Sequence, residues 1–384
     1  MKLKHPKAFT LVMILVILVT LSYLIPQCFS DSYSLFYQLL DSPNGSVYYN
    51  LNVVVPQSLY EYYQGKDHKQ VSVEDFAKFV TPYALKPIAD QLLEIYKDDE
   101  DFANGVLMIV HQIPYDASGP AKYPAETLVE NKGDCDQLSY IAASIMKAGG
   151  LDVVLLYYED KAHMNMGVHL SHTPLDARTP PYYVTYNGVR YYIAESTGGS
   201  WEDGWRVGEC PPDLKREKIQ IITLENSEQW APGQVSASYE TLTPSTLTLT
   251  ASSTFVYQGN TVTLFGQLSP NLQNEIITIY FKRGSSPWAM LATATTDSNG
   301  RFTSTLNVNE TGLYYVRASW SGNDHYMAAD SSVISITSLS ALFLVSLAIV
   351  IALICTGAVV FILKRQKYPE VEEHLIPEVP SLLK

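Results

Sequence analysis

Apolar residues are spread unevenly along the 384-residue chain, and their spacing divides it into four stretches. Two long runs, at residues 8–25 and 338–363, carry no charged side chain. Between residues 73 and 194 apolar positions recur first at helical spacing and then in alternation, whereas beyond residue 246 short alternating runs are separated by turn residues. The pattern predicts an apolar segment near each end, a mixed helix-and-strand region and a region made only of strands.

The mixed region reads as helices followed by an antiparallel sheet. The predicted helices are 73–79, 89–96, 101–113 and 135–147, and the predicted strands are 151–158, 163–170, 182–186 and 189–194. Asn187-Gly188 lies between the last two strands and is typical of a two-residue hairpin turn. This order predicts an α+β domain over residues 31–235.

The strand-only region predicts a second domain over residues 240–337. Its expected strands are 246–251, 261–268, 275–282, 288–296, 301–308, 312–320 and 331–337. Such a series of short strands is typical of an antiparallel β-sandwich, and the spacing around Tyr314 fits a tyrosine corner, with Val316 where antibody domains carry cysteine. This region resembles bacterial Ig-like surface domains without a disulfide, for which we expect a stalk or spacer role.

The two apolar ends predict a membrane topology. Residues 1–30 combine three lysines with an apolar run, which indicates a signal peptide cleaved after Ser30 or an uncleaved signal anchor. The run Ser338–Leu363 has the length of a transmembrane helix, and the basic residues that begin the tail 364–384 would keep that tail in the cytoplasm. We therefore expect a single-pass cell-membrane protein with extracellular domains.

Composition narrows the choice of partners and chemistry. A formal net charge of −13 argues against nucleic acid, whose binding needs basic surfaces. Sequons at Asn44 and Asn309 would fit a glycoprotein. Of four cysteines, Cys28 and Cys355 belong to the apolar ends, so a folded domain has only Cys135 and Cys210, and we expect Cys210 to be free or peripheral.

Residues 133–137 (Gly-Asp-Cys-Asp-Gln) place Cys135 at the start of a predicted helix. Asp134 is a good N-cap, and Gln137 completes a capping-box pattern. The positive end of the helix dipole favours a nucleophilic thiolate, whereas the carboxylates of Asp134 and Asp136 oppose it. A reactive thiol here needs a histidine partner; the alternative is a buried cysteine that only packs.

A histidine and a carboxylate follow at strand positions. His163 and His169 share one face of a predicted strand, roughly 20 Å apart, so only one of them can reach Cys135. His172 in the next loop is a weaker candidate. Glu195 ends a strand, where it can accept a hydrogen bond from an imidazole or lie solvated.

The motifs at residues 123–128, 133–136, 163–168 and 192–197 resemble those of the transglutaminase-like cysteine enzyme superfamily. The resemblance implies a papain-like α+β core and a catalytic triad of Cys135, His163 and Glu195. The chain departs from the usual pattern by Glu195 in place of aspartate and by Met164-Asn165 in place of small and aromatic residues. These departures leave the choice of substrate open.

The implied activity is attack of the thiolate on an amide or peptide carbonyl, followed by transfer of the acyl group to water or to an amine. The substrate would be an extracellular protein or peptide, and the sequence predicts no cofactor and no metal site. Gln112 or Tyr115 could line an oxyanion site, although an ordinary role at a helix end is favoured. A catalytically silent surface binding protein and a structural adhesin remain as alternatives, and the oligomeric state stays open.

Overall fold

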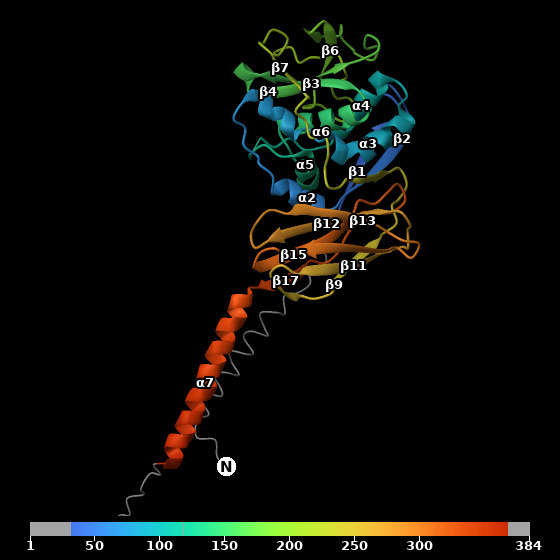
Figure 1. The fold of residues 1–384 in the computed structure, drawn as a ribbon. Helices are drawn as coiled ribbons and strands as arrows, with labels where there is room; N and C mark the ends of the chain where they lie inside the picture. Colours follow the sequence, from blue (N-terminus) through green and yellow to red (C-terminus); the bar gives the residue numbers. More distant parts are fainter. Residues whose placement is uncertain (1–31, 118, 368–384) are drawn as a thin grey trace, which may run out of the picture.

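The computed structural model describes residues 32–117 and 119–367, which form seventeen strands in four sheets together with several helices (Figure 1). Two sheets and most helices make up an N-terminal unit, and the other two sheets make up a C-terminal unit. The predicted signal segment 1–30 lies outside the described residues, as do residues 368–384 of the predicted tail.

The larger sheet of the N-terminal unit has the order β5-β6-β4-β3-β7, with antiparallel neighbours throughout. Its strands are β3 Asp152–Tyr158, β4 His163–His169, β5 Tyr183–Tyr186, β6 Val189–Ala194 and β7 Gln220–Thr223. The predicted β5–β6 turn is confirmed, since Asn187 and Gly188 both have positive φ (50° and 83°). The central position of β4 buries most of that strand.

Seven helical segments pack in this unit. They are α2 Gln57–Gln64, the 3-10 helix η1 Val73–Phe79, α3 Pro82–Ile95, α4 Asp99–Val110, α5 Pro124–Glu130, α6 Cys135–Ala148 and the 3-10 turn η2 Glu159–Lys161. Helix α6 contacts α3, α4 and α5 on one side and strands β3 and β4 on the other. Nearly every side chain from Cys135 to Met146 is therefore buried, as expected of a helix covered all round.

A second sheet of the N-terminal unit, with the order β1-β2-β8, was not predicted. It consists of β1 Tyr33–Leu40, β2 Tyr48–Val55 and β8 Ser236–Ser238. Sequence alternation does not reveal β1, because apolar side chains also occupy its outer face, where Phe36 is 54% exposed.

The C-terminal unit consists of two sheets packed face to face. Their orders are β10-β17-β15-β12-β13, with β16 paired to β15, and β14-β11-β9. The strands are β9 Thr246–Ala251, β10 Phe255–Tyr257, β11 Thr261–Ser269, β12 Ile276–Arg283, β13 Ala289–Thr295, β14 Arg301–Asn307, β15 Gly312–Trp320, β16 Ala329–Asp330 and β17 Ile334–Leu339. Buried residues of both sheets, such as Leu264 and Ile279, form one core.

Two details of this unit bear on the sequence predictions. The tyrosine corner is confirmed, because the Tyr314 hydroxyl donates to the backbone oxygen of Glu310 at 3.0 Å. The prediction of a wholly antiparallel sandwich is wrong, because β10 pairs with β17 in parallel. Strand β10 was not predicted, since it is only three residues long.

The two units meet where helix α2 lies against β12 and β15 (Figure 1). The buried Arg317 pairs with Glu61 of α2 at 2.9 Å and stacks over Trp288. Asp330 accepts the backbone N–H of Ser58 at 2.7 Å, so a carboxylate of one unit caps a helix of the other, whose own N-cap is a proline. These contacts join the two units through one buried charged group, Arg317, and two partly buried carboxylates.

The predicted fold class, an α+β papain-like core with an Ig-like sandwich and a C-terminal transmembrane helix, is wrong. The described chain is mostly β, in four sheets. The prediction counted one sheet in the N-terminal unit where there are two, and it read η1 as an α-helix.

The transmembrane span predicted at Ser338–Leu363 is also wrong. Strand β17 takes up Ser338 and Leu339, and helix α7, Ala341–Lys367, begins only afterwards. None of the helices in residues 32–117 and 119–367 combines the length and the apolar character needed to cross a membrane. The predicted single-pass cell-membrane localisation depended on that span and is corrected with it.

Candidate active site

Cys135 is the first residue of α6, as the capping pattern predicts. The Asp134 carboxylate accepts the backbone N–H of Gln137 and so caps the helix. The Cys135 side chain is nearly buried, with 9% exposure, and its Sγ lies 3.9 Å from the backbone oxygen of Ala162. Ala162 has a left-handed backbone (φ 47°) and leads directly into His163. The turn before β4 thus lies beside the thiol.

His163 is the first residue of β4 and contacts both other residues of the predicted triad. Its Nε2 lies 2.9 Å from Oε2 of Glu195, and the Cys135 thiol is close enough to contribute to its pKa. Burial by itself lowers the pKa of His163, but the hydrogen bonds and charges of Cys135 and Glu195 outweigh burial and raise the pKa to about 10. The imidazole therefore carries a positive charge at neutral pH.

Glu195 follows the last residue of β6 and is fully buried. Oε2 accepts hydrogen bonds from His163 and from the Asn165 amide, both at 2.9 Å. Oε1 accepts the backbone N–H and the hydroxyl of Thr197, at 2.9 and 2.5 Å. Burial raises the pKa of Glu195, but these donors, above all His163, outweigh burial and lower it. With four donors on two oxygens, Glu195 is a fixed carboxylate.

The other histidine candidates lie apart from the thiol. His169, at the far end of β4, is exposed, and its Nδ1 lies 3.0 Å from the Arg190 backbone oxygen. His172 pairs with Asp98 at 2.9 Å. Of the three histidines considered from the sequence, His163 is the one that contacts Cys135.

The acidic neighbours of Cys135 oppose a thiolate less than their number suggests. Burial, followed by the hydrogen bond and the charge of Asp134, raises the pKa of Asp136 to about 8. Asp136 therefore holds its proton more readily than an ordinary aspartate does.

The two side chains considered for an oxyanion site differ in position. Gln112 exchanges hydrogen bonds with the backbone of Gln38 in β1, so it has a structural role at the end of α4. Tyr115 pairs through its backbone with Gly133, and its ring is 58% exposed. Burial and then the charge of Cys135 raise the pKa of Tyr115.

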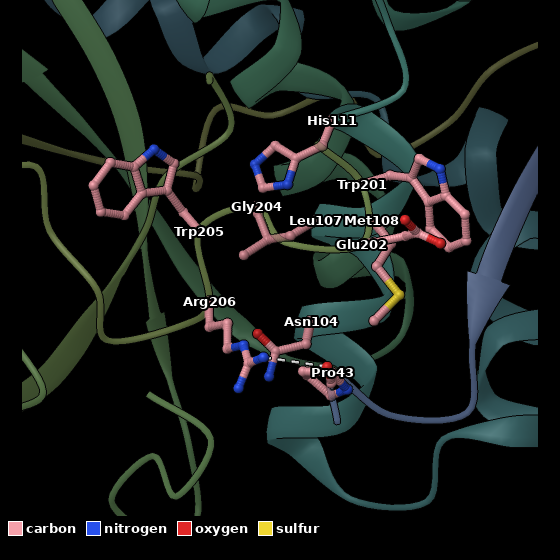
Figure 2. Close-up of a pocket in the computed structure, with 10 residues that line it drawn as sticks. All are labelled: Pro43, Asn104, Leu107, Met108, His111, Trp201, Glu202, Gly204, Trp205 and Arg206. Atoms are coloured by element: carbon pink, nitrogen blue, oxygen red, sulfur yellow. Dashed lines mark hydrogen bonds between the residues drawn. The ribbon is translucent and has the colours of Figure 1, made fainter. Parts of the chain in front are cut away.

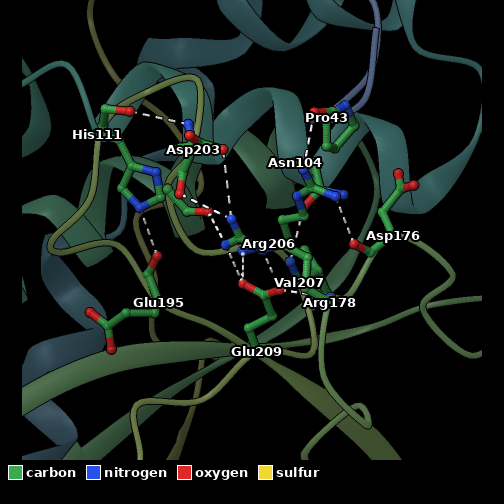
Figure 3. Close-up of polar contacts among 12 residues, drawn as sticks. Pro43, Asn104, His111, Asp176, Arg178, Glu195, Asp203, Arg206, Val207 and Glu209 are labelled. Atoms are coloured by element: carbon green, nitrogen blue, oxygen red, sulfur yellow. Dashed lines mark hydrogen bonds and ion pairs between the residues drawn. The ribbon is translucent and has the colours of Figure 1, made fainter.

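A polar network supports the loop that carries Glu195 (Figure 3). His111 donates from Nε2 to the Glu195 backbone oxygen at 3.0 Å, and burial lowers the pKa of His111, which keeps the ring neutral. His111 also lines a small pocket together with Trp201 and Trp205 (Figure 2). Glu209 lies farther along the same loop, and its two carboxylate oxygens accept hydrogen bonds from Arg178 at 2.9 and 2.7 Å. The end of β6 is therefore fixed from two sides.

Sequence reasoning missed four residues that hold the site. Asn165 and Thr197 each lie two positions from a predicted triad residue, so the motif spacing could have indicated them. Ser139 and Ser196 gave no such signal, because a buried serine in an apolar helix or beside a strand end is common.

One cluster among the described residues could offer ligands to a metal ion, namely Asp98, Glu100 and His172. The carboxylate of Glu100 already accepts the backbone N–H groups of Leu175 and Asp176, both at 2.7 Å. The ion pair between His172 and Asp98 engages the other two side chains. The cluster thus serves to hold the loop after β4 on helix α4.

No protein-family model and no curated protein sequence matches the chain. Among solved structures, part of the chain is similar to the crystal structure of a chitin binding domain from Burkholderia pseudomallei, with 15% sequence identity and a TM-score of 0.19. The similarity covers 22% of this chain and 56% of that chain, so only about half of that structure is matched. A likeness this weak assigns neither fold nor function.

Proposed function

We propose that the protein is a thiol enzyme of the transglutaminase-like kind that acts on carboxamide or peptide bonds through an acyl-thioester. The observation that carries the proposal is the bond of His163 to the four-fold hydrogen-bonded carboxylate of Glu195, beside a Cys135 thiol that lies 3.9 Å from the backbone oxygen of Ala162, the residue before His163. A nucleophile, a base and a group that orients the base are the parts that nucleophilic acyl transfer needs.

In the proposed reaction His163 holds the proton of Cys135, and the thiolate attacks the carbonyl carbon of the substrate. The Cys135 backbone N–H stabilises the oxyanion of the tetrahedral intermediate. His163 then gives its proton to the leaving nitrogen as the C–N bond breaks, which leaves an acyl-thioester on Cys135. Water or an amine, deprotonated by His163, attacks the thioester and releases the acid or a new amide together with the free thiol.

The electrostatics of the site favour this chemistry at neutral pH. The high pKa of His163 keeps the imidazolium in place as the counter-ion of the thiolate. The raised pKa of Asp136 weakens the negative charge that would otherwise raise the energy of that thiolate.

Alkylation of the full-length chain with iodoacetamide at pH 6 tests the proposal. Free cysteine is the reference, because burial raises the pKa of Cys210 to about 11 and by itself slows that thiol. We expect Cys135 to react at least tenfold faster than free cysteine, about 1.4 kcal/mol in the barrier. An equal or slower rate, measured by mass spectrometry of the Cys135 peptide, would refute an activated thiol.

A second experiment addresses turnover. Incubation with a peptide library and a fluorescent amine distinguishes hydrolysis, which yields shorter peptides or free acids, from transfer, which yields labelled peptides. We expect one of these products from the wild type and neither from Cys135→Ala. Equal product from the variant would remove Cys135 from the mechanism.

A further inference from the structure

A pair of buried serines lies directly behind the proposed triad. Ser139 and Ser196 are both fully buried, and their hydroxyl oxygens are 2.9 Å apart. Ser139 is one helical turn after Cys135, and its Oγ lies 2.7 Å from the Cys135 backbone oxygen and 3.2 Å from that of Met164. One hydroxyl therefore contacts three segments of the chain.

Each of these segments carries one residue of the triad. Helix α6 carries Cys135, Met164 directly follows His163 in β4, and Ser196 directly follows Glu195 after β6. The three segments are far apart in sequence, since Ser139 and Ser196 are separated by 57 positions. The side chain of Ser139 thus lies at the point where α6, β4 and the end of β6 meet.

The donor and the acceptor of the hydrogen bond between Ser139 and Ser196 can be assigned by counting hydroxyl protons. Each serine hydroxyl has one proton to donate. The shortest bond of Ser139 runs to the Cys135 oxygen, so its proton is directed there. The proton of Ser196 then points to Ser139, whose oxygen is its hydrogen-bond partner at 2.9 Å. The result is a chain from Ser196 through Ser139 to the Cys135 carbonyl, in which each bond strengthens the next.

We propose that Ser139 and Ser196 are positioning residues that set the distance between the Cys135 thiol and the His163–Glu195 pair. They touch neither the reacting sulfur nor a substrate; they act by fixing α6 against the end of β6, which leads into Glu195 and through it holds His163. The inference rests on the proposed function, because it assigns a task to these serines only if Cys135 and His163 react together. A misplacement of about 1 Å in such a pair can cost about a hundredfold in rate.

The test compares Ser139→Ala with Ser144→Ala. Ser144 is a matched control: it is fully buried on the same helix, donates back to the Tyr140 oxygen at 2.6 Å and accepts the Thr81 N–H at 2.8 Å, far from the triad along α6. Both variants lose comparable buried hydrogen bonds, so both lose stability in urea unfolding. Only Ser139→Ala is expected to slow Cys135 alkylation, by about tenfold or more.

Ser196→Ala provides a second variant with an independent effect on folding. We expect it to slow alkylation to a similar extent, and the double variant to be no slower than either single one, because the serines act as one chain. The dependence of the alkylation rate on pH should shift in Ser139→Ala and Ser196→Ala and stay unchanged in Ser144→Ala. A purely structural role would move the stability of all three alike and leave their pH profiles alone.

The outcomes separate the two proposals. If wild-type Cys135 reacts fast and all three variants match it, the positioning role is overturned and the proposed function stands. If wild-type Cys135 reacts no faster than free cysteine, the proposed function fails and the positioning role fails with it. Slowing confined to the Ser139 and Ser196 variants supports both.

Discussion

Replacement of Glu195 by glutamine tests the electrostatic basis of the site most directly. The substitution keeps the size of a fully buried side chain but removes the negative charge 2.9 Å from Nε2 of His163. It also turns one acceptor oxygen into a donor, although all four partners of Glu195 present hydrogens to it. Glutamine cannot satisfy Asn165 and Thr197 at the same time.

The size of the effect follows from the pKa of His163. A rise from 6.5 to about 10 stabilises the imidazolium by several kcal/mol, at about 1.4 kcal/mol for each tenfold change in proton affinity. Cys135 and Glu195 share this stabilisation. We therefore expect Glu195→Gln to lower the pKa of His163 and to slow Cys135 alkylation at pH 6 by at least tenfold. Loss of satisfied donors around the buried amide should also cost about 1–3 kcal/mol of folding stability.

The assay is the rate of iodoacetamide labelling of Cys135 as a function of pH, with urea unfolding of the same samples. Glu126→Gln is the matched control, because Glu126 is also buried and also pairs with a histidine, His68, at 2.8 Å. It should lose stability but keep the wild-type labelling profile. An unchanged profile in Glu195→Gln, or an equal change in both variants, would refute the electrostatic role of Glu195.

Three further outcomes follow from the structure. The folded state holds the His163 proton more tightly than the unfolded state does. The extra stability of the wild type over His163→Ala should therefore be fully present below about pH 6.5 and be lost as pH rises through about 10. A difference in urea unfolding that stays constant with pH would contradict this. Arg317→Ala removes a buried guanidinium together with its pairing to the partly exposed Glu61 and should cost about 1–3 kcal/mol. Arg283→Ala, in an exposed pair, should cost at most about 1 kcal/mol in the same denaturation experiment. Gly105→Ala would normally favour a helix, but here the added Cβ would lie 2.3 Å from the Tyr96 ring, so thermal unfolding should show destabilisation; a raised Tm would show that the ring can move aside.

The parts of the fold that sequence predicted well are those set by local rules. The start of α6 at Cys135 depends on a cap within three residues, and the β5–β6 hairpin depends on the positive φ of Asn187-Gly188. The Tyr314 corner likewise joins groups four residues apart. In each case the interacting groups are so close in sequence that the chain has few other ways to satisfy them.

The sequence predictions were wrong where the spacing of apolar residues does not match the surroundings of the segment in the folded chain. Strand β1 was missed because its outer face also carries apolar side chains, and η1 was read as an α-helix because a 3-10 turn has a similar spacing of apolar residues. The segment expected to cross a membrane begins in strand β17, where pairing with β15 and β10 decides the conformation of Ser338 and pairing with β10 that of Leu339. A run of apolar residues cannot reveal such a pairing partner.

By itself, the sequence determined the order of Cys135, His163 and Glu195 and the local elements that begin or end at each of them. Only the tertiary structure decided that His163 rather than His169 contacts the thiol and that Asn165 and Thr197 complete the hydrogen bonds of Glu195. The reason is physical. Capping and strand alternation act over a few residues, whereas the partners of a buried carboxylate are chosen by the packing of α6, β4 and β6 across tens of positions, where burial makes every unpaired donor costly.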